Sequence, residues 1–156
     1  MELLKIINGC IEMEQAVASV YGIFMQLFPD EKPFWEDLFN DELQHQALLS
    51  DPVNIQLIDL LPTEDILPKM EFIQNSLVFA NNTIRQIKSG TVTLEKALKT
   101  ALRLEESMVE IFANEFTANL LATDYRTLTE KILMAERIHI DKIEDMLIKK
   151  GFMQLS

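Results

Sequence analysis

The sequence predicts an all-α fold: a four-helix bundle of two antiparallel hairpins, with a long helical crossover between helices 2 and 3. Glycine and proline number only 4 and 5 among 156 residues, and they fall in groups between long stretches suited to helices. Within those stretches apolar residues recur at three- and four-residue spacing, which is the period of an amphipathic helix. Short links inside each half and a crossover of about forty residues between the halves match a known bundle topology.

The first hairpin is expected within the first fifty residues. Its first helix should span residues 2–28 and end at Pro29. Its second helix should begin near Pro33, because proline lacks an N–H and that absence costs nothing in the first turn of a helix. It should run to Leu49, where the segment 50–52 stops it with a proline.

The crossover region contains an additional helix. Its prolines prevent one long helix from following the first hairpin, so we expect short helical turns over residues 54–68. An amphipathic pattern then predicts a helix over residues 69–88, closed by the pair Ser89 and Gly90.

The second hairpin should fill the rest of the chain. Helix 3 is expected over residues 93–121 and helix 4 over residues 124–150, with Gly151 just beyond its end. Two lysines in the last turn of helix 4 complement the helix dipole. The candidate N-caps are Thr91 or Thr93 for helix 3 and Thr123 or Asp124 for helix 4.

Charge and cysteine content exclude several classes of protein. The formal net charge is −11, so the surface should repel nucleic acid and attract cations. Cys10 is the single cysteine, so neither an intrachain disulfide nor a CxxC metal site can form. Residues 1–10 lack the apolar core of a signal peptide, and no long uncharged apolar stretch predicts a membrane span. These features lead us to expect a cytoplasmic protein without membrane or nucleic-acid partners.

Both histidines of the chain occur in the same local pattern. Glu42 precedes His45 by three residues, and Glu136 precedes His139 by three residues. Side chains at positions i and i+3 are neighbours on a helix face, with Cβ atoms about 5–6 Å apart. A carboxylate and an imidazole placed in this way can bind one metal ion together. One such motif is a weak signal, but the presence of both histidines in it is a stronger one.

Two more glutamates are expected to point inward, each from a different helix. Glu14 lies on the apolar stripe of helix 1, whereas Glu12 lies on a polar side. Glu105 lies on the apolar stripe of helix 3, whereas Glu106 and Glu110 share a side with basic residues. A buried carboxylate is costly unless it is paired or coordinates a metal. The resulting ligand candidates are Glu14, Glu42, His45, Glu105, Glu136 and His139.

Each half of the chain thus contains a glutamate, an aromatic residue two turns later, a turn and an ExxH motif. This arrangement resembles the ferritin-like di-iron carboxylate superfamily, and especially its rubrerythrin-type members, here without a rubredoxin domain. The resemblance implies a single ferritin-like di-metal domain over residues 1–156, with two iron ions that manganese or zinc could replace. It assigns Glu14 and His45 to one ion, Glu105 and His139 to the other, and Glu42 and Glu136 to bridging positions.

The resemblance also concerns residues around the ligands. In several relatives an aspartate before the ExxH glutamate holds the histidine of the opposite motif, and Asp41 matches that position for His139. The second motif has Ala135 at this place, so His45 lacks the equivalent partner. Met108 stands where rubrerythrins carry a further glutamate. Tyr21 is either a hydrogen-bond partner of a ligand glutamate or a core aromatic residue.

The function implied by the resemblance is that of a di-iron oxidoreductase. Such a site would oxidise Fe(II) with dioxygen or peroxide, or reduce those oxidants with electrons from an external donor, since the chain has no rubredoxin domain. A homodimer is expected because such bundles associate through apolar helix faces. Two alternatives remain: a ferritin-like iron storage or detoxification cage, and a non-enzymatic helical interaction module. Cys10, Trp35 and the scattered methionines are interpreted as core residues.

Overall fold

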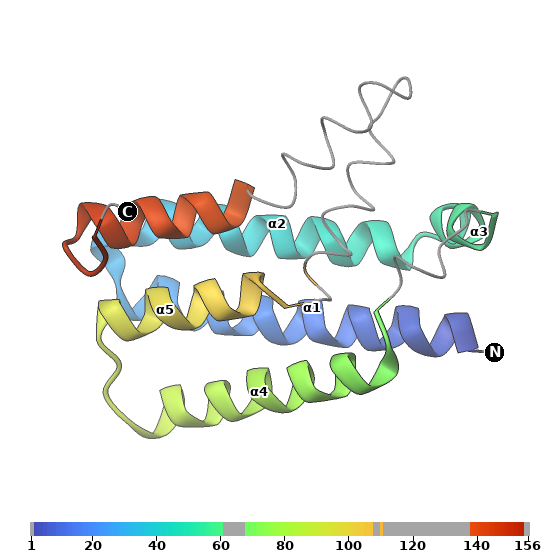
Figure 1. Cartoon of the computed structure of the whole chain (residues 1–156), viewed down its shortest axis with the longest axis horizontal. Coiled ribbons are helices and arrows are strands. Elements are labelled where there is room, and N and C mark those ends of the chain that lie inside the picture. Colours follow the sequence, from blue (N-terminus) through green and yellow to red (C-terminus); the bar gives the residue numbers. More distant parts are fainter. Residues whose placement is uncertain (1, 61–67, 108–109, 111–137, 155–156) are drawn as a thin grey trace. The chain divides into compact units, whose positions relative to one another are not determined.

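The computed structural model describes residues 2–60, 68–107, 110 and 138–154 (Figure 1). In this part of the chain all regular secondary structure is helical, which confirms the predicted all-α class. The chain divides into two compact units, Met1–Ser89 and Gly90–Ser156. The association of four helices into one bundle stays a prediction. Among the described helices, none combines the length and apolar content needed to cross a lipid bilayer.

The first unit begins with the predicted helical hairpin. Helix α1 spans Glu2–Leu27, a short 3-10 turn η1 covers Pro29–Glu31, and helix α2 spans Lys32–Ser50. Pro33 lies in the first turn of α2, as its missing N–H favours. Helices α1 and α2 pack against each other over much of their length (Figure 1).

A further helix, α3, follows at Pro52–Leu60. The residue before it, Asp51, adopts an extended backbone, as expected before a proline. Its Oδ1 atom accepts a hydrogen bond of 2.9 Å from the backbone N–H of Val53, which satisfies one of the free donors at the start of α3. The expected short helical turns are therefore at least partly one nine-residue helix.

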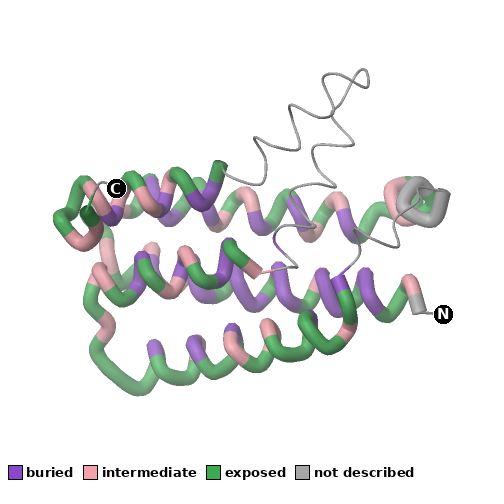
Figure 2. Tube along the Cα trace, in the orientation of Figure 1, coloured by how far each residue is buried: buried purple, intermediate pink, exposed green. Residues whose placement is uncertain are grey.

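The crossover helix α4, at Met70–Ser89, confirms the expected element and packs against α1. The two helices approach closely at Gly9, because a Cβ atom added there would lie 2.9 Å from the Cγ2 atom of Ile73. Figure 2 shows buried positions recurring along α1, α2 and α4. The core of the first unit therefore lies among these helices, with α1 in contact with both of the others.

An aromatic cluster around Trp35 fills the core near the turn between α1 and α2. The ring centroid of Trp35 lies 4.9 Å from those of Phe24 and Phe34, 6.0 Å from that of Tyr21 and 6.5 Å from that of Phe28. Trp35, Tyr21 and Phe24 are almost completely buried. Such tilted and edge-to-face pairs add to the stabilisation from burial alone. The cluster fixes the register of α1 against α2.

The second unit opens with helix α5, at Leu94–Glu105. The side chain of Thr93 accepts a hydrogen bond from the backbone N–H of Lys96, so Thr93 is the N-cap. The prediction that this helix continues unbroken to residue 121 was wrong. The backbone N–H of Ser107 bonds to Leu104 in a tightened turn, and the Ser107 hydroxyl accepts from the backbone N–H of Glu110. The regular helix is therefore interrupted at Glu106 and Ser107.

A helix over residues 138–149 ends the described part of the second unit. Gly151 has a positive φ of 80°, which glycine adopts without steric penalty. The backbone N–H of Phe152 bonds to Leu147, and that of Gly151 bonds to Ile148, so the helix ends in a Schellman motif. This agrees with the predicted end of helix 4; its predicted start and caps lie outside the described residues.

Candidate metal centre

Helix α1 directs one carboxylate into the core of the first unit. Glu14 lies in the interior of α1 and its side chain is fully buried, with Met13 and Val17 buried beside it. Glu12, only two residues earlier, is exposed. The predicted choice of Glu14 over Glu12 as the inward carboxylate is therefore confirmed. Glutamate is rarely buried in this way without a compensating partner.

Helix α2 supplies a second carboxylate and an imidazole. Its buried residues recur at helical spacing and include Glu42 and His45 between Leu38 and Leu49. The ExxH motif therefore lies on the buried stripe, as the sequence predicted. Because Glu42 and His45 are one turn apart, both side chains reach the same side of α2.

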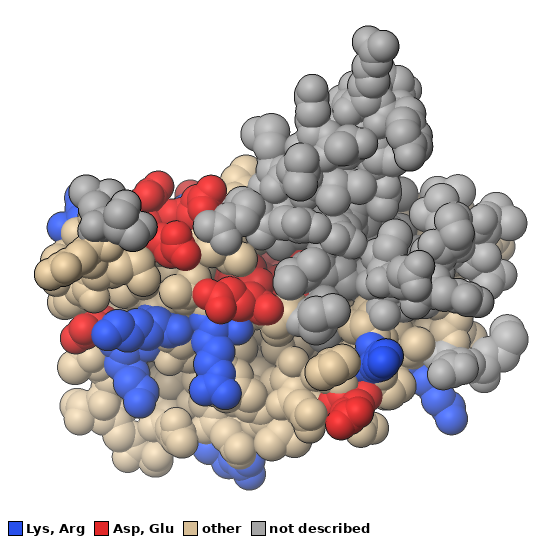
Figure 3. All heavy atoms as spheres, viewed as in Figure 1, with Lys and Arg blue, Asp and Glu red and all other residues tan. Residues whose placement is uncertain are grey.

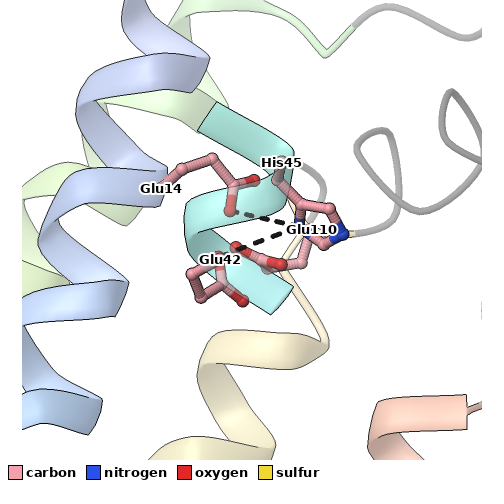
Figure 4. Close-up of side chains that lie close together, drawn as sticks. All are labelled: Glu14, Glu42, His45 and Glu110. Carbon is pink, nitrogen blue, oxygen red and sulfur yellow. Dashed lines mark hydrogen bonds and ion pairs between the residues drawn. The ribbon is translucent and has the colours of Figure 1, made fainter. Parts of the chain in front are cut away.

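The three side chains meet between α1 and α2 (Figure 4). The Nδ1 atom of His45 lies 3.4 Å from Oε2 of Glu14 and 3.9 Å from Oε2 of Glu42. One ligand atom from each of the three residues can be chosen such that all lie within 4.8 Å of one another. A histidine nitrogen facing two carboxylates from two helices could therefore hold a metal ion.

The second unit repeats one part of this geometry. The Nδ1 atom of His139 lies 3.3 Å from Oε2 of Glu105, and both side chains are buried. These residues come from two helical segments, as Glu14 and His45 do in the first unit. Glu136, the glutamate of the second ExxH motif, lies outside the described residues.

Charged residues lie on the exposed face of α5, which agrees with the position of Glu105 on its buried face. Lys96, Lys99 and Arg103 are exposed, and Figure 3 shows basic side chains gathered over this helix. Lys99 forms an exposed ion pair of 2.9 Å with Glu95. The helix therefore presents a charged face to solvent, while Glu105 and Leu104 belong to its buried face.

One predicted orientation in this region was wrong. Glu110 was expected on the exposed side with Lys99 and Arg103, but its side chain is fully buried. The expectation assumed an unbroken helix, whereas the helix is interrupted at Glu106 and Ser107, before Glu110. A serine followed three residues later by a glutamate resembles a capping box, a signal that could have indicated the interruption. Glu110 is labelled in Figure 4 and belongs to the second unit.

The structure gives different results for the other residues that the sequence analysis considered. Asp41 is partly buried, and its predicted interaction with His139 stays a prediction. Tyr21 is fully buried and its ring packs against Trp35, while its hydrogen bond to a ligand glutamate stays a prediction. Cys10 and Trp35 are also fully buried, which confirms that they are core residues.

Comparisons of the chain with protein-family models, with curated proteins and with solved structures found no match. The case for a function therefore rests on the donor atoms and their geometry.

Proposed function

We propose that this chain is a ferritin-like di-iron oxidoreductase that uses dioxygen or peroxide as its oxidant. One observation carries the proposal: in each unit, a buried histidine Nδ1 atom faces a buried glutamate oxygen from another helix. The distances are 3.4 Å for His45 and Glu14 and 3.3 Å for His139 and Glu105. Each of the two histidines of the chain faces a buried glutamate, so the same pairing occurs twice.

The donor set fits iron or manganese better than softer metals. Carboxylate oxygens are hard ligands, imidazole nitrogen suits first-row transition metals, and no thiolate motif accompanies them. Burying several carboxylates near one another is unfavourable, and a divalent cation would offset their charge and their lost hydration. Glu14, Glu42 and His45 fit such a cation because all three are buried and their ligand atoms lie close together.

The ligand set implied by the resemblance includes Glu14, Glu42 and His45 of the first unit and Glu105, Glu136 and His139 of the second. In that set Glu42 and Glu136 would be bridging ligands, as in the rubrerythrin-like proteins that the sequence resembles. Asp41 would hold the imidazole of His139 in the orientation that ligation needs.

The protein's own groups would bind the metals, orient them and keep bulk water away. Bound iron would supply one-electron redox chemistry toward dioxygen or peroxide. His45 and His139 would provide neutral nitrogen donors, and the glutamates would provide negative charge. Leu38 and Leu49 flank the ExxH motif on α2 and are nearly completely buried, so this side of the site excludes solvent.

Anaerobic loading of the full chain with Fe(II) tests the proposal. We expect about two bound iron ions per chain after desalting, in keeping with the two-ion sites of such bundles. Exposure to dioxygen or peroxide should then oxidise the iron, and an external reductant should restore it over repeated cycles. Failure to retain iron would contradict the site, and a single uptake of oxidant with no cycling would contradict the oxidoreductase role.

A matched pair of variants separates specific binding from general acidity. Glu14→Gln removes one charge from the buried group, and Glu12→Gln removes one charge from the exposed side of the same helix. We expect Glu14→Gln to lower the iron content and Glu12→Gln to leave it unchanged. Growth of the protein into a large hollow assembly on iron loading would support the storage cage instead.

A further inference from the structure

We propose that two copies of this chain associate through the outer face of helix α4, as an antiparallel dimer with its two-fold axis at Val78. This surface belongs to the first unit and contains none of the candidate metal ligands, so the inference does not depend on the proposed function. It assigns a surface and a direction to the homodimer expected from the sequence.

Helix α4 has two opposite faces. It packs against α1 and buries four residues: Ile73, Ala80, Thr83 and Ile87. Figure 2 shows exposed positions recurring along the whole helix. On the side opposite the buried face lies a stripe of exposed residues, which we call the outer stripe: Glu71, Gln74, Val78, Asn82 and Arg85. At about 3.6 residues per turn, these positions fall within about 80° of the helix circumference.

The spacing of the outer stripe is the same in both directions along the helix. Its successive members are three, four, four and three residues apart, with Val78 at the centre. A two-fold axis at Val78 would therefore set Glu71 of one copy opposite Arg85 of the other. It would also set Gln74 opposite Asn82, and both amides can donate and accept hydrogen bonds. Val78 is 59% exposed in one copy and would be covered by its equivalent.

The side chains in the middle of the outer stripe can be covered at low cost. Gln74, Val78 and Asn82 are uncharged, and uncharged groups lose less hydration free energy than charged groups on burial. Within one copy the Arg85 guanidinium donates a hydrogen bond to the amide oxygen of Asn82. A guanidinium has five N–H donors, so others remain for Glu71 of a second copy.

Charge favours this face of the chain and this direction of pairing. Two copies that each carry a formal net charge of −11 repel one another in general. Helix α4 carries one acidic residue, Glu71, and two basic residues, Arg85 and Lys88, which gives it a net charge of +1. A parallel pair would place Glu71 beside Glu71, whereas an antiparallel pair places it beside Arg85. Opposite charges at the two ends of the stripe therefore specify the antiparallel direction.

The size of the face predicts a weak and reversible dimer. A helix of 20 residues is about 30 Å long and about 10 Å wide. Two such faces would cover roughly 600 Å² in total, which is less than the ~1,200 Å² of typical stable interfaces. We therefore expect a dissociation constant on the order of 100 μM, so that the dimer forms only at high protein concentration.

Sedimentation equilibrium of the full chain over a range of concentrations tests the proposal. Glu71→Arg and Arg85→Glu each convert both ion pairs of the dimer into like-charge contacts. We expect each variant alone to dimerise about tenfold or more weakly. An equal mixture of the two variants should form a heterodimer as readily as the unaltered chain, because opposite charges then face each other again. Both residues are exposed, and circular dichroism shows that helix content is retained.

Cysteine cross-linking tests the direction and the axis. The native Cys10 is fully buried, so an added surface cysteine would be the reactive one. Val78→Cys should give a disulfide-linked dimer under mild oxidation, because the two copies meet at this position. Glu71→Cys is the matched control, since the two copies of position 71 would lie about 21 Å apart along an antiparallel pair. A disulfide requires Cα atoms within about 7 Å.

Three results would overturn the proposal: a chain that stays monomeric up to about 1 mM, a dimer that both charge variants leave unchanged, or equal cross-linking at positions 71 and 78. The second result would place the dimer contact on another surface, and the third would indicate a parallel or non-specific contact. Metal uptake is measured separately, so its failure would contradict the proposed function and leave this dimer in place.

Discussion

The Nδ1 atom of His45 lies 3.4 Å from Oε2 of Glu14, although 31 residues separate the two in the chain. The contact joins the interior of α1 to the interior of α2, inside a core that is otherwise mainly apolar. A metal ion held between these side chains would connect the two helices only in the folded state. The free energy of metal binding should therefore add to the folding stability of the first unit.

Metal should raise the thermal stability of the protein, and His45→Ala should remove most of that gain. A ligand that binds only the folded state at about 100 times its Kd stabilises it by about 2.7 kcal/mol. Thermal unfolding with and without Co(II) measures the effect. Gln44→Ala is the matched control, because Gln44 is the exposed neighbour of His45. An equal metal-induced shift in both variants would show that His45 is not a ligand.

Glu14→Gln should make the metal-free protein more stable while weakening its response to metal. Ligand oxygens of Glu14 and Glu42 lie within 4.8 Å of each other in a buried region, so their negative charges repel. An amide of similar shape removes that repulsion and reduces the cost of desolvation. Urea unfolding in a chelating buffer should show a higher free energy of unfolding for Glu14→Gln than for the unaltered chain. A loss of stability would mean that the Glu14 carboxylate supports the fold by itself.

The helical period was sufficient to predict most of the first unit and its candidate ligands. Glu14, Glu42 and His45 could be assigned to the core because α1 and α2 are continuous and each shows one apolar stripe. Proline positions fixed the end of α1 and the start of α2, since backbone sterics there act locally. These features depend on neighbouring residues, so a single sequence is sufficient to predict them.

The second unit shows where such reasoning fails. The interruption after Glu105 depends on Ser107, whose hydroxyl accepts from the backbone N–H of Glu110. The free energies of a serine in a helix interior and of a serine at a cap differ little, so contacts in the surrounding structure can determine which of the two forms. Glu110, which follows this interruption, is buried. Contacts between segments that are far apart in the chain cannot be read from the helical period of a single sequence.

Gly9→Ala should destabilise the protein, even though alanine is a better helix former than glycine. The new methyl group would lie 2.9 Å from Cγ2 of Ile73, an atom on a β-branched side chain that cannot easily move aside. Such overpacking typically costs about 1–3 kcal/mol. Denaturant unfolding of the metal-free protein measures the change.

Gly22→Ala is the matched control within the same helix. A methyl group there would meet Phe39 at 3.6 Å, which is an ordinary van der Waals contact. We expect this variant to be more stable by about 0.5–1 kcal/mol, because alanine loses less backbone entropy in a helix. If Gly9→Ala were as stable as Gly22→Ala, the close packing of α1 on α4 would be wrong.

Glu105→Gln should reduce the iron content to about one ion per chain, while Glu106→Gln should leave it unchanged. The two residues are adjacent, but Glu105 is buried beside His139, whereas Glu106 is exposed. Each substitution removes one negative charge, so any general attraction of cations by the acidic surface falls equally in both. Metal analysis after anaerobic Fe(II) loading gives the ratio directly. If Glu105→Gln retained two ions, Glu105 would not be a ligand, and if Glu106→Gln lost one, the orientation of α5 would be wrong.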